Sequence, residues 1–277
     1  YVAGVVQKTP VEISEPGRSR SEFRYKDGFA ALRADGSVVT WGLEPTGHYG
    51  GGAKSNVEAF LSSGVKQIYS SNYGFTALKQ DGSVVTWGET GNGQARQFGT
   101  GIIDVASNET GFSAITEKGE ILSWGGGISS TFTRIVNSGA SKIYSNPLGF
   151  AAIKTDGSVI AWGNTNAGGQ FSIEIADKLT SGVIDIAATR SEFAALKQDG
   201  SVVTWGTWAE KSKSVADKLS GGVLKLYSNN TDFAALKSDG SVVAWPWNNS
   251  DFDRVKAQLQ GGVREIYSNT VSFAAVK

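Results

Sequence analysis

Apolar and polar residues follow one arrangement that returns along the chain. The segment Phe29-Ala-Ala-Leu-Arg-Ala-Asp-Gly-Ser-Val-Val-Thr-Trp41 places two strand-forming runs around an Asp-Gly pair, and it recurs at 75–87, 112–124, 150–162, 193–205 and 233–245. The copy at 112–124 has Lys118-Gly119 in place of Asp-Gly. Phe and Trp are always twelve residues apart, whereas successive copies begin 37 to 46 residues apart. Asp-Gly between two such runs favours a two-residue type I′ hairpin. A fixed unit with a period of about 40 residues predicts propeller blades or solenoid turns.

Each hairpin is preceded by another apolar run, so every unit supplies at least three antiparallel strands. These runs lie at 65–69, 102–106, 143–144, 183–187, 223–227 and 263–267. Some connectors place aliphatic residues four apart shortly before glycine, which predicts short helices at 56–61, 174–179, 214–219 and 254–259. The second and third units lack this signal and have the shortest spacings, 37 and 38 residues.

The two ends of the chain predict how the repeats close. A single sheet of this kind cannot bury both of its faces, so the units must stack on one another. A seventh copy starts at Phe273 and stops at Lys277, whereas the chain begins with the apolar run Tyr1-Val-Ala-Gly-Val-Val6. We therefore expect the first strand to complete the last blade, which gives an all-β, seven-bladed propeller over a single domain, residues 1–277. Because methionine is absent, we expect this domain to be excised from a larger protein or processed.

Composition excludes several classes of partner. Lysine plus arginine equals aspartate plus glutamate at 26 each, so no field is expected to attract nucleic acid. No apolar run approaches the roughly 18 residues of a membrane span, and no membrane insertion is expected. Cysteine is absent, which excludes disulfides and cysteine-ligated zinc.

The repeated motif also resembles a known family. Its pattern, Gly-Val-x-x-Ile-Tyr-Ser-Asn followed by Phe-Ala-Ala-Leu-Lys-x-Asp-Gly-Ser-Val-Val-x-Trp-Gly, resembles the repeats of the RCC1-like seven-bladed β-propeller superfamily over nearly the whole chain. It looks most like the bacterial branch that includes β-lactamase inhibitory protein II. The resemblance implies a propeller, within a family that contains guanine-nucleotide exchange factors, enzyme inhibitors and modules of bacterial secreted or surface proteins. The fold alone does not choose among these functions.

The resemblance also points to one face of the propeller. In the inhibitor, the residues just before the Phe-containing strand line that face and are rich in aromatics. The corresponding triplets here are Tyr25-Lys26-Asp27, Ser71-Asn72-Tyr73, Asn108-Glu109-Thr110, Asn146-Pro147-Leu148, Thr189-Arg190-Ser191, Asn229-Asn230-Thr231 and Asn269-Thr270-Val271. Only two of the seven contain an aromatic residue, which disfavours β-lactamase inhibition. The exchange factor's β-wedge and basic tail have no equivalent in this sequence.

Repeats within one chain separate structural positions from free ones. Residues shared by all units, such as Phe, Trp and the turn glycine, should serve the blade, whereas positions that vary are free to serve a partner. The predicted partner-binding residues are Tyr25, Lys26, Asn72, Tyr73, Glu109, Pro147, Leu148, Arg190, Asn230, Thr231, Thr270 and Val271. Tyr25, Tyr73, Leu148 and Arg190 are the expected anchors, since Tyr and Arg are enriched in interface hot spots. The alternative is that the recurring Ser-Asn makes only local turn hydrogen bonds.

A second candidate surface lies on the connectors. Trp208 and Trp247 fall outside the Trp-Gly register, and with Tyr49 they form a possible carbohydrate-binding or secondary site. The alternative is that such aromatics cover the short helices, as expected for Phe171.

Catalysis has little support in the sequence. The only histidine, His48, lies in a glycine-rich loop, and no nucleotide-binding glycine motif occurs in a strand-to-helix context. The aspartates of the Asp-Gly turns are explained by turn geometry, so we predict no metal and no cofactor. We therefore expect a non-enzymatic protein-recognition module of a secreted or cell-surface bacterial protein. The alternatives are a lectin-like module, a guanine-nucleotide exchange factor or an enzyme inhibitor.

Overall fold

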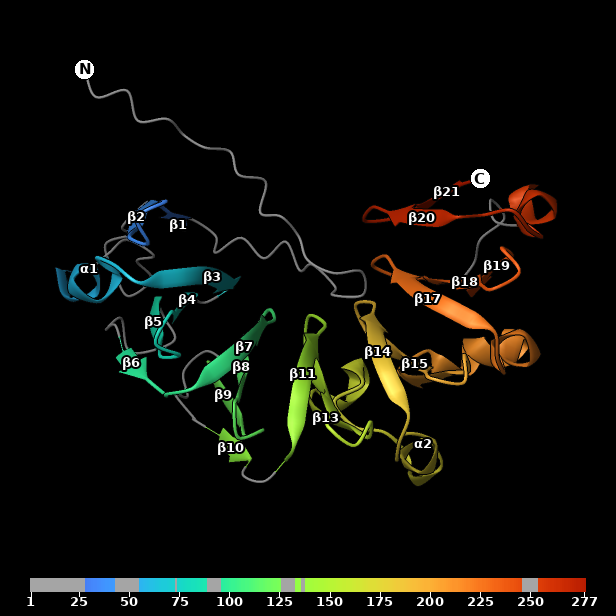
Figure 1. Cartoon of the computed structure of the whole chain (residues 1–277), viewed down its shortest axis with the longest axis horizontal. Coiled ribbons are helices and arrows are strands. Elements are labelled where there is room, and N and C mark those ends of the chain that lie inside the picture. The colour runs from blue at the N-terminus through green and yellow to red at the C-terminus, as the bar shows by residue number, and fades with distance from the viewer. Residues whose placement is uncertain are drawn as a thin grey trace, which may run out of the picture.

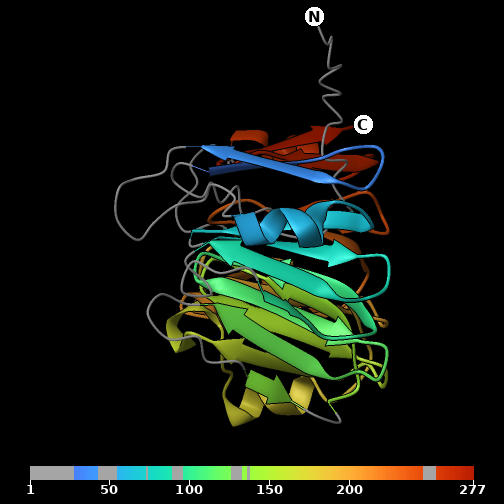
Figure 2. The same cartoon turned by 90° about the vertical axis from the view of Figure 1, so that its left-hand side faces the viewer.

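Seven small antiparallel sheets follow one another in an arc around a common axis (Figure 1). The structure is a computed structural model that describes residues 28–42, 55–72, 74–88, 96–125, 133–135, 138–245 and 254–277. Neighbouring sheets lie face to face as successive layers, with the first and last sheets at the two ends of the arc (Figure 2). This confirms the all-β fold of seven propeller blades. The expected pairing of the first strand with the last blade falls on residues outside those described.

The blades are numbered here in chain order. Blade 1 is formed by β1 (Gly28–Leu32) and β2 (Val38–Gly42). Blade 2 is formed by β3 (Val65–Ser71), β4 (Gly74–Lys79), β5 (Val84–Gly88) and β6 (Arg96–Phe98). Blade 3 is formed by β7 (Ile102–Ser107), β8 (Gly111–Thr116), β9 (Ile121–Gly125) and β10 (Thr133–Ile135). Blade 4 is formed by β11 (Ala140–Ser145), β12 (Gly149–Lys154) and β13 (Val159–Gly163). Blade 5 is formed by β14 (Val183–Ala188), β15 (Glu192–Lys197) and β16 (Val202–Gly206). Blade 6 is formed by β17 (Val223–Ser228), β18 (Phe233–Lys237) and β19 (Val242–Trp245). Blade 7 is formed by β20 (Glu265–Ser268) and β21 (Phe273–Val276).

The repeated Phe and Trp form one cross-strand pair in each of blades 1 to 6. In blade 5, Phe193 lies opposite Trp205, and the two rings stack with centroids 5.3 Å apart. The same stacked pair occurs in blades 2, 3, 4 and 6. The constant twelve-residue offset is therefore the register of a hairpin, and the prediction that these aromatics are structural is confirmed.

The Asp-Gly turn differs from the predicted type I′ hairpin. In blade 2 the Gly82 N–H donates to the Lys79 carbonyl, and the Lys79 N–H donates to the Ser83 carbonyl. This pattern is a three-residue loop in which a β-turn is followed by a left-handed glycine, with φ of 74° at Gly82. The Asp81 carboxylate accepts both the N–H and the O–H of Ser83, and these bonds hold the pKa of Asp81 below its usual value. Aspartate is thus needed for its side-chain acceptor rather than for a positive φ.

The connectors explain the variable spacing of the repeats. The predicted helices are α1 (Ser55–Leu61), α2 (Ile173–Lys178) and the 3₁₀ helices η3 (Ala209–Leu219) and η4 (Lys256–Leu259), and they lie on the outer rim (Figure 1). A shorter 3₁₀ turn, η2 (Thr165–Ala167), precedes α2. Blades 2 and 3, whose connectors lack a helix signal, instead have a short fourth strand, β6 or β10.

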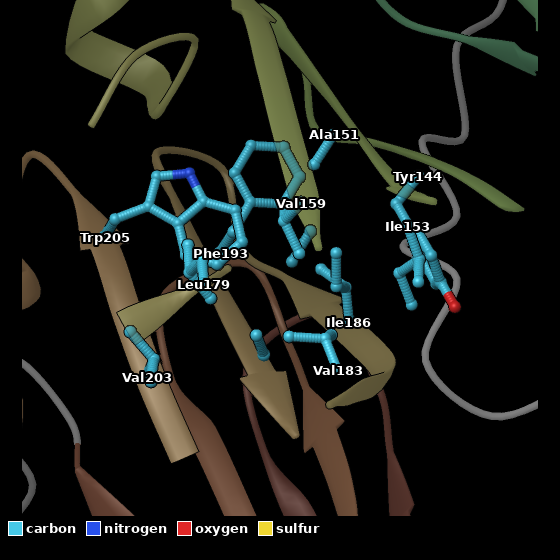
Figure 3. Packing of buried hydrophobic residues seen from close by; sticks show 12 residues of the cluster. Tyr144, Ala151, Ile153, Val159, Leu179, Val183, Ile186, Phe193, Val203 and Trp205 are labelled. Carbon is cyan, nitrogen blue, oxygen red and sulfur yellow. The ribbon is translucent and has the colours of Figure 1, made fainter. Parts of the chain in front are cut away.

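Apolar side chains fill the space between neighbouring blades. Between blades 4 and 5, Ile153 and Val159 from one sheet lie in the same buried cluster as Ile186, Phe193 and other residues of the next (Figure 3). Equivalent clusters join blades 2 and 3 and blades 5 and 6. The core of this protein is therefore a series of interfaces between sheets, as expected for repeats that cannot bury their faces alone.

Main-chain hydrogen bonds reinforce this packing at the rim. The Val183 N–H of blade 5 donates to the Gly157 carbonyl in the Asp-Gly turn of blade 4, at 2.9 Å. The same bond recurs between every pair of successive blades from blade 1 to blade 7. The contact requires glycine, because a Cβ at Gly157 would lie 2.7 Å from the Gly182 nitrogen.

These rim contacts predict unequal costs for two glycine substitutions. Gly157 and Gly262 share a φ of 75°, but a Cβ at Gly262 would meet no atom within 4 Å. We expect Gly262→Ala to lower the free energy of unfolding by about 1–2 kcal/mol through backbone strain alone. Gly157→Ala should cost about 1–3 kcal/mol more, because two blades must separate. Urea denaturation measures both, and equal losses would contradict a steric role for the blade contact.

Candidate functional site

The turns between the first and second strands of blades 2 to 7 converge toward the middle of the arc (Figure 1). We call these turns the tips, and they contain the triplets expected to bind a partner. Equivalent tip residues are joined by main-chain bonds from blade to blade. The N–H groups of Asn72, Glu109, Arg190 and Asn230 donate to the carbonyls of Glu109, Pro147, Asn230 and Thr270, at 3.1, 2.9, 2.9 and 3.1 Å. We call the six residues the tip ring: Asn72, Glu109, Pro147, Arg190, Asn230 and Thr270.

The tip ring is interrupted between blades 4 and 5. Pro147 has no backbone N–H, so blade 4 cannot donate to Arg190 in the way that the other blades donate to their successors. The main-chain bonds therefore run in two series, one over blades 2 to 4 and the other over blades 5 to 7.

A side chain within the turn fixes the shape of most tips. In blade 3 the Asn108 Oδ1 accepts the N–H groups of Thr110 and Gly111, both at 2.9 Å. Asn146, Asn229 and Asn269 make the same pair of bonds in blades 4, 6 and 7. The recurring Asn thus has the local turn role considered from the sequence. Blade 5 has Thr189 at this position.

The predicted partner-binding residues differ in their exposure. The exposed ones are Asn72, Arg190, Thr231, Thr270 and Val271, and the half-buried ones are Glu109, Leu148 and Asn230. Pro147 is buried, so the ring contains its main chain while its side chain packs inside. Tyr25, Lys26 and Tyr73 lie outside the described residues, as do Tyr49 and Trp247 of the possible carbohydrate site.

Trp208 retains an open surface on the connector of blade 5. It immediately precedes η3 and is 40% exposed, and the Lys211 ammonium lies 5.0 Å from its ring centroid. By contrast, Phe171 meets Trp205 edge-on at a centroid distance of 5.9 Å and packs against the core between blades 4 and 5. Phe171 therefore has a packing role in this core, unlike the half-open Trp208.

Sequence reasoning overlooked one residue near the tips, Glu192. The position before the repeated Phe is glycine in blades 1 to 4, and a Cβ at Gly74 would lie 2.2 Å from the Trp87 carbonyl oxygen. Blades 5, 6 and 7 have Glu192, Asp232 and Ser272 there. The departure from glycine was visible in the sequence, but the spatial restriction on that position was not.

The Glu192 carboxyl has an unusual environment. The residue is 6% exposed, and its Oε1 has no hydrogen-bond partner in the described part of the chain. Burial raises the pKa of Glu192 to about 7, Lys211 and the Trp208 backbone N–H oppose this rise, and Asp232 of blade 6 adds to it. Glu192 therefore loses its proton at a higher pH than an exposed glutamate does.

The described residues offer no evident metal or membrane site. Among them, no group of three or more His, Cys, Asp or Glu side chains could hold a metal ion. None of the helices in the described ranges has the length and apolar character to cross a bilayer.

Several solved structures are similar to this chain. Prp20p of Saccharomyces cerevisiae, described with its binding to Gsp1p and histones, is 14% identical over 80% of this chain and 70% of its own, with a TM-score of 0.49. Yeast RCC1 (Prp20) in complex with Kap60 is 16% identical over 65% of this chain and 55% of its own, with a TM-score of 0.44. The ectodomain of the Arabidopsis thaliana receptor kinase ACR4 is 13% identical over 80% of this chain and 76% of its own, also with a TM-score of 0.44. No protein-family model and no curated protein matches the chain. Its assignment as a propeller rests on the seven blades themselves.

The turn asparagines predict that burial sets the cost of losing the same two hydrogen bonds. Asn108 is 1% exposed, whereas Asn269 is exposed to water. We expect Asn108→Ala to lower the free energy of unfolding by about 1–3 kcal/mol, because buried N–H groups lose their acceptor. Asn269→Ala should cost less than about 1 kcal/mol, since water replaces the side chain. Thermal unfolding of both variants provides the measurement, and the reverse order would refute this role for the buried turn.

Proposed function

We propose that this chain is a non-enzymatic protein-recognition module whose binding face is formed by the tips. The observation that carries the proposal is that the backbone of the tip ring holds the blades together, whereas its side chains vary. Main-chain bonds between blades and asparagine bonds within the turns fix the backbone. The side chains at the linked positions are Asn, Glu, Pro, Arg, Asn and Thr, so one fixed backbone frame carries five different residue types at six equivalent positions.

A frame of this kind favours binding because little has to be ordered on docking. Loops that are already fixed lose little conformational entropy when a partner binds. Arg190 and Val271 are both exposed, and they offer a charged donor and an apolar contact from blades 5 and 7. The resemblance of the repeats to the bacterial branch of the RCC1-like superfamily supports a place within a secreted or surface protein.

Carbohydrate binding at Trp208 is the second candidate. The specific observation in its favour is that the indole is 40% exposed, because aromatic faces stack on sugars. Lys211 lies over the ring, so a sugar would have to use the opposite face or displace the lysine. A glycan array probed with the folded protein and with Trp208→Ala tests this candidate, and an identical empty array for both would eliminate it.

Partner binding should depend on exposed tip side chains and not on rim charges. We expect Arg190→Ala combined with Thr270→Ala to weaken the complex by about tenfold or more, because arginine is a frequent interface anchor. The melting temperature should stay within about 2 °C of the parent, since surface substitutions seldom change stability. The partner would be captured by crosslinking in the host and purified, and affinities would be measured by calorimetry.

The control is Lys213→Ala on the outer rim. Lys213 is an exposed cation on η3 whose partner, Glu210, belongs to the same helix. It should leave the affinity unchanged. Loss of affinity in this control together with full affinity in the tip variant would move the binding face to the rim.

A further inference from the structure

The strongest departures from the repeat occur together at the tip of blade 5. This tip has Thr189 in place of the turn asparagine, and it follows Pro147, which cannot donate to it. Its main-chain link within the tip ring is the bond from the Arg190 N–H to the Asn230 carbonyl of blade 6. The position of the tip therefore depends on blade 6 more than on blade 4.

Glu192 lies immediately behind this link. Its carbonyl accepts the Thr189 N–H at 2.9 Å, and the neighbouring Ser191 carbonyl accepts the Thr207 N–H at 3.2 Å. The residues that shape the tip thus include the residue whose buried carboxyl has an oxygen without a partner in the described ranges. A change in the position of Glu192 would move Arg190, only two residues away.

The charges around Glu192 come from two other elements. Lys211 lies on η3, and Asp232 lies just before β18 of blade 6, in the position equivalent to Glu192. The Asp232 carboxylate is held by the Thr231 hydroxyl at 3.0 Å and the Asn229 amide at 3.3 Å. Ionised Glu192 is therefore repelled by a fixed carboxylate across the junction of blades 5 and 6, whereas Lys211 and the Trp208 backbone N–H on the connector favour the ionised form.

We propose that protonation of Glu192 controls how firmly the tips of blades 5 and 6 are held together, and through them the shape of the tip face. The neutral acid removes the repulsion with Asp232 and leaves no charge on the buried Glu192 side chain, so the Arg190–Asn230 link is strongest when Glu192 is protonated. Regulation of binding by this group rests on the proposed function, whereas its effect on the link does not.

The direction of the pH dependence follows from the two protonation equilibria. Burial raises the pKa of Glu192 from 4.5 to about 7 in the folded protein. Below pH 4.5 the carboxyl is protonated whether the tip is closed or open, so the pH has no effect through this group. Between pH 4.5 and about 7 the closed tip binds the proton more tightly, and stability falls as the pH rises. Above that range the loss is complete.

The test is amide hydrogen exchange followed by NMR at pH 5 and pH 7.5, with rates corrected for intrinsic base catalysis. We expect the protection of the Arg190 amide to fall by about tenfold or more between these pH values. Glu109 is the internal control, because its N–H makes the equivalent bond to Pro147 between blades whose corresponding positions are glycine. Its protection should not change. In Glu192→Gln, which keeps the shape but cannot ionise, the protection of Arg190 should become independent of pH.

Three outcomes overturn the proposal: equal pH dependence at Glu109 and Arg190, no pH dependence at Arg190, or the same pH dependence in the Gln variant. If Glu192→Gln does not fold, Asp232→Asn tests the repulsion, and it should reduce the pH dependence at Arg190; an unchanged profile contradicts the model. These measurements need no partner. Failure of the tip variants to affect a complex would therefore count against the proposed function and leave this inference standing.

Discussion

The main-chain hydrogen bonds between successive blades are the constraint on which the rest of this structure depends. Each blade is tied to the next at the rim, where a turn carbonyl such as that of Gly157 accepts an N–H such as that of Val183. Most of the described neighbours are tied again at the centre through the tips. Apolar packing supplies the bulk of the favourable free energy, but it has no direction. The backbone bonds set the angle and register at which the apolar faces meet, and buried backbone groups must find such partners in any case.

Because backbone groups make these ties, the side chains at the same positions are free to vary. The tip ring shows this most clearly, since Asn72, Glu109 and Arg190 make the same kind of bond with unlike side chains. The rim shows the opposite case, where only glycine allows one blade to approach the next. A single principle thus produces an invariant rim and a variable centre. Variation of the side chains at the centre is therefore compatible with stability, because it leaves the main-chain bonds between blades unchanged.

The sequence predicted the fold well because each unit repeats its own evidence. Seven copies of one hydrophobic pattern predict seven sheets, and the fixed offset between Phe193 and Trp205 proved to be a cross-strand register. The turn type was wrong, because Asp-Gly is compatible with two hairpins and the choice depends on which backbone groups pair. The tip residues were found by comparing equivalent positions, yet their links depend on distances between blades that no local pattern contains. Glu192 was overlooked because the sequence shows only that glycine is replaced at this position. It does not show that at Gly74, the equivalent position of blade 2, the Trp87 carbonyl leaves no room for a side chain.

The tip of blade 5 is where the two roles, support and variation, meet in the same residues. Elsewhere a position either holds the blade, as Asn108 does, or faces outward. At blade 5 the turn asparagine and the glycine are both replaced, and the preceding blade cannot donate to the tip, so a buried acid lies where the main-chain link of the tip ring runs to blade 6 alone. Replacement of structural residues is ordinarily expected to lower the stability of the fold without any other effect. Here the replacements surround the bond between Arg190 and Asn230, so any loss of stability they cause is concentrated on the face that carries an exposed arginine. A frame that is rigid around most of its centre can therefore be adjustable at one junction, and protonation of a single carboxyl is enough to adjust it.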